Sequence, residues 1–586
     1  MSKLIAALDS INNMQLGENK HLEFKWSDTD MQEQIMQLYF QLVRADASQM
    51  EVLRTKFDSI VQSLFTLTFH GKVARKVDVK MYFTLIVRLV CQTRDIVSGK
   101  GEYALAYMML HTLNNYFPDF AEYALEKFVM SDEGKKPYGS WKDMKYIASY
   151  CKTKLNYVNT NRLVKKCIQL INDQLVSDIC KDNACDISLC AKWVPRESSK
   201  KHSWFFRILA KDFFIDNDFM KTAVSDSSKK NAKLKCYAKY RQMLAKLNNR
   251  IDTVQIKQCA NTWASIDHNR TTSITLSRNK KAFLNVTKTG EVRSTLCDRI
   301  TCAENFKTYI DSRIKSGKEV KGGNVGLNDF TRQAYELVGN ELTNSIEIDL
   351  LNSQWRSNAS QTGSLNKMIA MVDVSGSMEG DPMDVAIALG IRVAEKSILG
   401  KRVLTFSAEP EWHNLDKLDD FVSMVGSLKR AKWGANTNFY AALTLILKTM
   451  IEHKVPPEDA DGLVLAIFSD MQIDSANNSS FNYSSMYKNI NSMYEMAGYK
   501  CPHILFWNLR STSGFPTLSN SKGTSMLSGF SPALLNLFCE KGMEALDQIT
   551  PWFMMLESLN HERYSCLNEY IESHFEDMGF ESLTIE

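Results

Sequence analysis

The sequence lacks the features that mark membrane-spanning and secreted proteins. None of its apolar runs reaches the ~18 residues that a membrane-spanning helix needs. The opening residues, MSKLIAALDS, contain an apolar segment too short for a secretory signal. We therefore expect a protein of the cytoplasm, with the nucleus as the alternative, that has no membrane partner.

The sequence also lacks the C-x-x-C spacing of a zinc site. Its 13 cysteines are scattered. Cys180, Cys185 and Cys190 recur every five residues, as do Cys297 and Cys302, and neither group has the spacing that zinc ligands need. In a long chain, an odd number of scattered cysteines indicates reduced thiols rather than a disulfide framework. We expect these thiols to be mostly buried.

The most informative stretch is residues 368–378, MIAMVDVSGSM. Its first half is a short apolar run typical of a strand that is buried on both faces. Where this run ends, Asp373, Ser375 and Ser377 alternate, so an extended backbone projects their oxygen atoms to one side. One carboxylate and two hydroxyls suit Mg²⁺, with Mn²⁺ or Ca²⁺ as alternatives, better than zinc. The pattern predicts a divalent-metal site, and the alternative is an ordinary polar turn between a strand and a helix.

Two later residues extend this pattern. Thr437 lies in GANTNF, and Asp470 closes the apolar run LVLAIFSD. In this order, the residues resemble the metal-ion-dependent adhesion site (MIDAS) of the von Willebrand factor A (vWA) fold. The resemblance implies that Asp373, Ser375 and Ser377 contact the ion. It also implies that Thr437 acts directly or through water and that Asp470 holds water molecules around the ion. An acidic side chain of a partner protein, or a phosphate oxygen, would complete the octahedral coordination of the ion.

Hydrolytic motifs are missing around this site. A phosphatase of the Asp-x-Asp kind would need a second carboxylate where Ser375 stands. Neither a G-x-S-x-G nucleophile elbow nor a Ser-His-Asp arrangement is recognisable in the sequence. We therefore expect that the protein is not an enzyme.

Charge is divided unevenly along the chain. Residues 361–586 contain 17 Lys and Arg against 28 Asp and Glu, a net charge of −11, whereas residues 1–360 contain 54 against 39, a net charge of +15. One explanation is complementary packing of two oppositely charged domains. The other is that the basic part attracts a polyanion, most plausibly nucleic acid.

The basic residues concentrate in two clusters that are interleaved with aromatic residues. The first cluster contains Lys192, Arg196, Lys200, Lys201 and Arg207, and the second contains Lys229, Lys230, Lys233 and Lys235, followed by Lys239 and Arg241. Cations attract phosphates, and aromatic rings such as Trp193 and Trp204 can stack on unpaired bases. The alternative is that these lysines form a solvated helix face and that the aromatic residues belong to a core.

Apolar spacing predicts a helical region followed by an α/β region. Helical spacing runs from about Leu22 to Phe83 and continues in later segments, which are 81–90, 103–116, 120–130, 144–155 and 162–176. Such helices, joined by short links, indicate a HEAT-like array. From about residue 365, apolar strands alternate with helices, as in a doubly wound, Rossmann-like sheet. We predict a helical domain at 1–360, an α/β domain at 365–550 and an acidic helical extension at 551–586, with a linker at 357–364.

The stretch RDIVSGKGE, residues 94–102, does not fit a nucleotide-binding loop. Gly101 follows Lys100 where a P-loop has Ser or Thr, Arg94 stands in place of the first glycine, and helices flank the stretch. We predict instead a link between two helices, with Asp95 and Glu102 capping the neighbouring helix ends.

Three stretches of the helical part carry a wider resemblance. CAKWVPRESSKK, KYRQMLAKL and the WASI element near Trp263 are similar to a family found in plants, fungi and giant DNA viruses, which joins a helical part to a vWA domain. That arrangement resembles the Ro autoantigen, in which a ring of HEAT-like helices (the TROVE domain) is closed by a vWA domain. The resemblance implies a non-catalytic RNA-binding protein with a MIDAS metal ion. The alternative is a protein-interaction scaffold whose metal ion grips an acidic residue of a partner.

Overall fold

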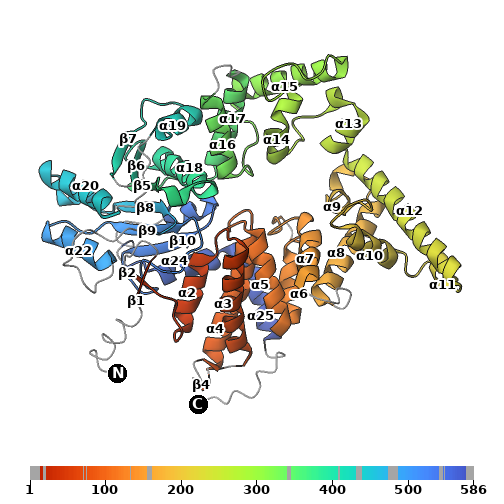
Figure 1. Cartoon of the computed structure of the whole chain (residues 1–586), viewed down its shortest axis with the longest axis horizontal. Helices are drawn as coiled ribbons and strands as arrows, with labels where there is room; N and C mark the ends of the chain where they lie inside the picture. Colours follow the sequence, from red (N-terminus) through yellow and green to blue (C-terminus); the bar gives the residue numbers. More distant parts are fainter. Residues whose placement is uncertain are drawn as a thin grey trace.

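Figure 1 shows the computed structural model of the chain, in which a helical region is followed by an α/β region. The ribbon of the helical region runs in an arc from one side of the α/β region to the other. The structure describes residues 14–17, 22–66, 68–69, 72–73, 75–131, 134–154, 161–339, 345–406, 409–430, 439–472, 486–539, 546 and 548–575.

Helices form the first part of the chain, as predicted. They are α2 (Met31–Gln41), α3 (Ala47–Phe65), α4 (Lys76–Arg94), α5 (Tyr103–Tyr116), α6 (Pro118–Lys127), α7 (Lys142–Lys154) and α8 (Arg162–Cys180). Local signals set their starts: Asp46 and Gln49 form a capping box on α3, and Pro118 opens α6. Each helix buries an apolar face against its neighbours, with α3 against α5 and α5 against α6.

Two short hairpins in this part differ from the helical prediction. β1 (Met14–Leu16) pairs antiparallel with β2 (Leu22–Phe24), and β3 (Thr68–Phe69) pairs with β4 (Lys72–Val73). The prediction of helix from Leu22 was therefore wrong at its start. The backbone of Phe24 exchanges two hydrogen bonds with Phe515, of 2.9 and 3.0 Å. This partner is almost 500 residues away, so local spacing carries no sign of the pairing.

The second part of the helical region contributes to two separate cores. Its helices are α9 (Cys190–Trp193), α10 (Ser203–Phe213), α11 (Asp218–Lys221), α12 (Asp226–Ile251), α13 (Val254–Ala260), α14 (Ser273–Phe283), α15 (Cys297–Lys315), α16 (Leu327–Val338) and α17 (Ser345–Ala359). In the smaller core, Leu276 and Phe283 of α14 pack with Phe306 and Ile310 of α15. The other core is much larger and extends from the first helices through the α/β region to the end of the described chain.

A six-stranded mixed sheet forms the centre of the α/β region. In spatial order its strands are β10 (Thr524–Ser528), β9 (His503–Asn508), β8 (Val464–Ser469), β5 (Met368–Asp373), β6 (Arg402–Phe406) and β7 (Glu411–Asn414). All neighbours are parallel except β6 and β7. Every residue of β5, β8, β9 and β10 is buried, which explains the apolar runs of β5, β8 and β9.

The helices of this region largely follow the predicted alternation. They are α18 (Asp381–Lys396), α19 (Phe421–Leu428), α20 (Phe439–Glu452), α21 (Pro457–Ala460), α22 (Met486–Met496) and the 3₁₀ helix η5 (Pro532–Phe538). Asp420 sets the start of α19, because its carboxylate accepts a hydrogen bond from the N–H of Ser423. The edge strand β7 was not predicted. Its mixed polar sequence, EWHN, is half exposed and lacks the apolar run of a central strand.

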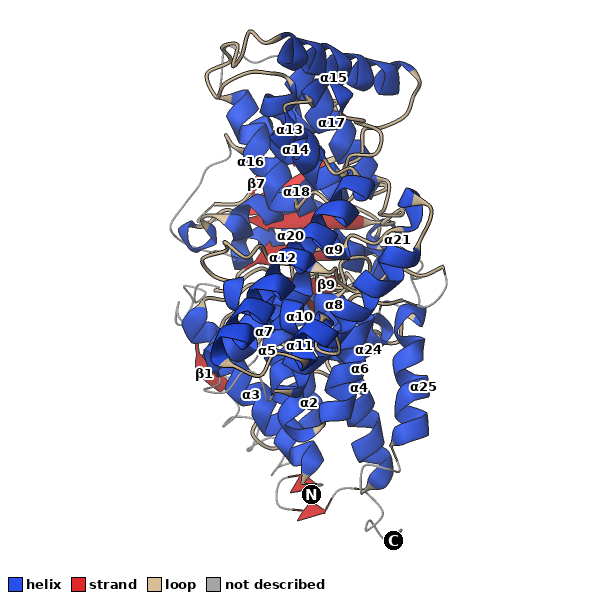
Figure 2. Ribbon diagram, turned by 90° about the vertical axis from the view of Figure 1, so that its right-hand side faces the viewer, coloured by secondary structure: helices blue, strands red, loops and turns tan. Residues whose placement is uncertain are grey.

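The helical region packs against the α/β region at both of its ends. Figure 2 shows the sheet strands between α14–α17 above and α2–α6 below. At one end α2 contacts β10, and at the other end α16 packs against α18 and α19. Lys100 strengthens the contact between α2 and β10. Its buried Nζ donates to the carbonyl oxygen of Leu42, which follows α2 (3.1 Å), and to Ser528 Oγ of β10 (2.6 Å). The GKG stretch therefore positions a lysine that ties α2 to β10.

The last described segment returns onto the first helices. It consists of α24 (Pro551–Leu559), the 3₁₀ helix η6 (Glu562–Tyr564) and α25 (Ser565–His574), which contact α4. The ring of Tyr570 stacks on that of Tyr123, with centroids 3.8 Å apart. The predicted extension is thus helical, and it packs closely against the helical region.

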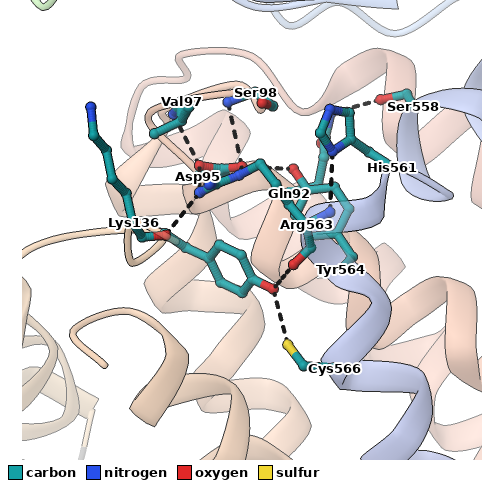
Figure 3. A network of polar contacts seen from close by, with 11 residues as sticks. Gln92, Asp95, Val97, Ser98, Lys136, Ser558, His561, Arg563, Tyr564 and Cys566 are labelled. Atoms are coloured by element: carbon teal, nitrogen blue, oxygen red, sulfur yellow. Dashed lines mark hydrogen bonds and ion pairs between the residues drawn. The ribbon is translucent and has the colours of Figure 1, made fainter. Parts of the chain in front are cut away.

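Asp95 holds this segment in place (Figure 3). Its buried carboxylate accepts two hydrogen bonds of 2.9 Å from Arg563 and one of 3.0 Å from the hydroxyl of Tyr564. It also accepts from the backbone N–H of Val97 (2.9 Å). Glu102 precedes α5 without making a capping hydrogen bond and pairs with Arg44 instead. The predicted capping roles of Asp95 and Glu102 were therefore wrong, because partners distant in sequence take both carboxylates.

The stretch predicted as a linker is buried only in part, since three of its eight residues are buried and four are exposed. Helix α17 runs into it, and both Asn358 and Thr362 are almost fully inaccessible to solvent. Arg392 of α18 donates to Thr362 Oγ1 (3.0 Å) and to Asn358 Oδ1 (2.9 Å). Small polar residues here satisfy a buried arginine rather than forming a flexible connection.

All 13 cysteines are free thiols. Six are buried, three are half-buried and four are exposed, so the prediction of mostly buried thiols holds for fewer than half of them. In the part of the chain that the structure describes, no helix is both long and apolar enough to cross a membrane.

Candidate metal site and basic surface

The candidate metal site lies where the strand order of the sheet reverses. From β5 the chain adds β6 and β7 on one side, and then crosses to add β8, β9 and β10 on the other. The carboxyl ends of β5 and β8 therefore open onto a crevice, which is where ligands of such sheets bind. Asp373 ends β5 and Asp470 directly follows β8, so the fold brings these two predicted site residues together.

Hydrogen bonds shape the loop after β5. The N–H of Ser375 donates to Asp373 Oδ1 (2.9 Å), and Ser469 Oγ donates to Asp373 Oδ2 (2.6 Å). Ser375 Oγ and Ser377 Oγ lie 3.1 Å apart at the start of the 3₁₀ turn η4 (Gly376–Met378). The loop thus gathers one carboxylate and two hydroxyls, as the alternating pattern predicts.

The loop after β8 supplies the second carboxylate. Asp470 is fully buried, and its Oδ1 accepts from the N–H of Gln472 (3.2 Å). Between them, Met471 has a φ of 61°, in the left-handed region that non-glycine residues rarely adopt. Such a conformation costs of order 1–2 kcal/mol and recurs at functional sites, where the surrounding structure holds it. The left-handed conformation of Met471 turns the chain sharply at the point where Asp470 faces Asp373.

The electrostatics of this pair favour a cation. Burial and, to a lesser extent, the negative charge of Asp470 together raise the pKa of Asp373 to about 7, although hydrogen bonds from Ser469 and Ser375 oppose the rise. A divalent ion would relieve both effects, because it attracts each carboxylate and replaces its lost hydration. Two carboxylates and two hydroxyls form an oxygen-only donor set, which fits Mg²⁺ or Mn²⁺.

Two further observations bear on this site. Among the described residues, no cluster of three or more His, Cys, Asp or Glu side chains is arranged to hold a metal. Thr437, the remaining predicted ligand, lies outside the described residues.

Arg510 and a cavity adjoin the site. The Nη1 atom of Arg510 lies 3.7 Å from Asp470 Oδ2 and donates to the carbonyl oxygen of Ser377 (3.3 Å). Beside Ser377, a cavity of about 620 Å³ opens between the two regions of the protein and is lined by Arg44 and Gln49 from the helical side. A ligand that reaches the metal loop would therefore also touch the helical region, which the sequence alone did not indicate.

The first predicted basic cluster is divided by the structure. Lys192, Arg196 and Arg207 line one cavity of about 880 Å³ between α9, α10 and α12. Lys200 and Lys201 lie in the exposed turn that precedes α10 and do not line it. The nearby aromatic rings are also divided: Phe205 and Phe206 are buried in the core, whereas Trp193 and Trp204 are partly exposed.

The second predicted basic cluster lies on one long helix. Lys229, Lys230, Lys233 and Lys235 are all exposed on α12, while Tyr237 and Tyr240 of the same helix are buried. Lys235 and Lys239 hold their amino groups 4.7 and 5.0 Å from the centre of the Phe219 ring. The lysines therefore form a solvent-facing basic surface, and the tyrosines are core residues.

The sequence-based prediction missed two basic residues that lie near the first cluster. Lys142 and Lys145 of α7 place Nζ atoms 5.9 and 5.0 Å from the centre of the Trp193 ring, and Lys192 adds a third at 5.7 Å. Burial lowers the pKa of Lys192, and burial together with the charge of Lys142 lowers that of Lys145. A pair of lysines three residues apart is ordinary in a helix, so only the packing of α7 against α9 could reveal this group.

The fold and the site together define a protein that joins a helical region to an α/β region with a carboxylate and hydroxyl cluster at its switch point. Residues 159–360 match the family described as "Domain of unknown function (DUF2828)", and residues 367–563 match "Domain of unknown function (DUF7788)". The chain is 30% identical over 516 residues to "Uncharacterized protein L728" of Acanthamoeba polyphaga mimivirus. The aligned residues cover 84% of this chain and 82% of that protein. The chain belongs to the same family as this mimivirus protein.

Proposed function

We propose that this protein is a non-catalytic RNA-binding protein of Ro-like architecture. In this proposal, the helical region contacts RNA, and the α/β region, as a vWA-type domain, binds a divalent ion. The observation that carries the RNA part is the group of three lysines around the partly exposed ring of Trp193. Lysines attract phosphates, and an indole ring stacks on an unpaired base of any sequence.

The surroundings of this group support a polyanion. Within the described part of the chain, none of Lys142, Lys145 and Lys192 lies in an ion pair. Lys145 and Lys192 are partly buried, so an anion that reaches them stabilises their charged forms. The exposed lysines of α12 form a second basic group on the helical region.

The packing of the two regions supports the Ro-like part of the proposal. The helical region contacts the α/β region through α2 at one end and α16 at the other. This is the connectivity that a ring of helices closed by a vWA domain requires.

The metal part of the proposal rests on the oxygen donors at the switch point. Asp373, Ser375 and Ser377 would hold the ion, with Asp470 and Thr437 acting directly or through water. When bound, the ion would supply an electrophilic position for an acidic oxygen of a ligand. The hydroxyl of Ser469 and the N–H of Ser375 both donate to the carboxylate of Asp373 and so orient it for this role.

The test is a titration of the full-length protein with single-stranded RNA at several salt concentrations. We compare the wild type with a variant in which Lys142, Lys145 and Lys192 become Gln. A matched control replaces three exposed lysines of the α/β region, Lys417, Lys448 and Lys522. If the three lysines neutralise about three phosphates, their loss should flatten the salt slope by about 2, since each phosphate contributes about 0.7 for single strands.

The outcomes separate the proposal from its alternative. Weaker binding and a flatter slope only in the first variant support RNA binding by the helical region. Equal effects of both variants, or no binding by the wild type at micromolar concentration, contradict it. The acidic-partner scaffold would then be the better account, and the cavity of about 620 Å³ beside Ser377, which could admit a side chain to the metal loop, is the observation that favours it.

A further inference from the structure

The cavity between α9, α10 and α12 has the size and the charge of a small-ligand site. Its volume is about 880 Å³, within the range of roughly 300–1,000 Å³ that is typical of ligand pockets. Four cationic side chains line it, namely Lys192, Arg196, Arg207 and Arg241, against one carboxylate, Glu197. The lining is therefore strongly positive.

The single carboxylate is already neutralised. Glu197 forms an ion pair with Arg241 across the cavity lining. Among the described residues, Lys192, Arg196 and Arg207 have no acidic partner. Lys192 is half-buried, and its burial lowers the pKa of its amino group because the charged form is poorly hydrated there. An anion in this cavity would restore the missing counter-charge.

The walls of the cavity suit a flat apolar body. Trp193 is the partly exposed aromatic residue of the lining, and the buried Pro195 and Phe206 lie behind it in the apolar wall. The Phe206 ring is fixed in the core by an edge contact with Tyr240, with centroids 5.5 Å apart. At the opposite border, Thr253 and Gln255 offer hydrogen-bonding groups. The cations could hold the phosphate of a nucleotide, and the apolar wall could hold its base. The polar groups could form hydrogen bonds with the edge of that base.

We propose that this cavity binds one nucleotide, with its phosphate held by Arg196 and Arg207 and its base against Trp193. The inference rests on the proposed RNA binding, because the nucleotide would belong to an RNA strand that the neighbouring lysines hold. A free mononucleotide has the same chemistry and serves as the probe.

The experiment titrates the full-length protein with AMP and UMP, and with adenosine and inorganic phosphate as fragments of the probe, by isothermal titration calorimetry. We expect saturable one-to-one binding of the nucleotides and at least about tenfold weaker binding of either fragment. Arg207→Gln should weaken nucleotide binding by about tenfold, since a charge-assisted hydrogen bond to phosphate is lost. Arg196→Gln serves as a second variant. Both side chains are exposed, so neither change should disturb folding.

A matched control and a second measurement complete the test. Lys417→Gln removes one positive charge from an exposed position of the α/β region, outside the cavity lining, and should leave AMP binding unchanged. Trp193→Leu should weaken AMP but not inorganic phosphate. Absence of saturable AMP binding at millimolar concentration, or equal loss in the Lys417 and Arg207 variants, would overturn the nucleotide site.

RNA titrations with the same variants separate this inference from the proposed function. Loss of AMP binding together with weaker RNA binding in the Arg207 variant supports both. RNA binding by a protein that does not bind AMP, and that Arg207→Gln leaves unchanged, overturns the cavity site and leaves the proposed function standing. Binding of AMP without binding of RNA overturns the proposed function and assigns the cavity to free nucleotides.

Discussion

At the scale of single residues, Asp373 concentrates the chemistry of the α/β region. Its carboxylate is buried, faces a second carboxylate and is oriented by the hydroxyl of Ser469. Two like charges in one dry site are costly unless a cation separates them. The arrangement is therefore easier to explain as a site prepared for an ion than as a packing element.

We predict that Mg²⁺ or Mn²⁺ raises the melting temperature and that Asp373→Asn abolishes this effect. At a hundredfold excess over the dissociation constant, the ion should add about 2.7 kcal/mol to the free energy of unfolding of the wild type. The measurement is thermal unfolding with and without metal. Asp461 lies just before the first residue of β8, at the opposite end of the strand from Asp470. Asp461→Asn should therefore retain the full shift in melting temperature. No shift in the wild type at millimolar metal would contradict the metal site.

His268 is a second residue whose environment has a measurable consequence. It is buried among Phe283, Phe306 and Tyr309, and neither ring nitrogen has a hydrogen-bond partner among the described residues. Burial lowers its pKa to about 4 from an ordinary value of 6.5. Between these values the unfolded chain binds more protons than the folded one, so His268 lowers the stability as the pH falls from 6.5 towards 4.

We predict that His268→Phe reduces the acid sensitivity of the protein. The wild type should lose melting temperature between pH 7 and pH 5, and the variant should lose less, with an equal or higher melting temperature at pH 7. Thermal unfolding across this range measures both quantities. The exposed His453→Gln should behave as the wild type. Identical pH profiles for His268→Phe and the wild type would show that the histidine is not held neutral by its burial.

At the scale of elements, the joint between α4 and the C-terminal segment depends on one buried ion pair. Arg563 lies almost entirely out of solvent and Asp95 completely so, and both oxygens of Asp95 are used by Arg563. Breaking such a pair by removing one charge is far more harmful than losing a surface pair, because it leaves the other charge buried and uncompensated.

We predict that Asp95→Asn destabilises the protein by roughly 3 kcal/mol, measured by urea unfolding. The double variant Asp95→Asn with Arg563→Met should recover part of this loss, because it removes the uncompensated charge. Arg75→Ala breaks an exposed ion pair with Asp78 and should leave the unfolding curve unchanged. If Asp95→Asn had no more effect than Arg75→Ala, the segment would be held by its apolar contacts alone.

At the scale of the whole molecule, the connection between the two regions is part of a packed interface. Arg392 is buried, stacks over the Trp355 ring at 4.4 Å and donates to Asn358 and Thr362. In the same place Gly322 leaves room for the backbone of α17, since a Cβ atom there would lie 1.8 Å from the carbonyl oxygen of Gln354. The chain therefore passes between the regions through a tight contact.

We predict that proteinase K does not cut the native chain within residues 357–363. Arg392→Met keeps a similar volume but leaves the oxygens of Asn358 and Thr362 without their donor, so the stretch should become a cleavage site. Arg402→Met, which removes a surface ion pair with Asp416, should not expose it. Mass spectrometry of the fragments identifies the cuts. Cleavage there in the wild type would restore the prediction of an open linker.

By itself, the sequence determined the order of the helical and α/β regions, the central strands and the loop of Asp373, Ser375 and Ser377. These features depend on neighbours in the chain: apolar spacing sets a helix or a strand, and alternation sets the direction of side chains. The tertiary structure alone decided which distant groups meet. Phe24 pairs with Phe515, Asp95 holds Arg563 instead of a helix end, and Lys142 and Lys145 converge on Trp193. Such contacts depend on how packed elements face one another, and neighbouring residues in the chain carry no record of that.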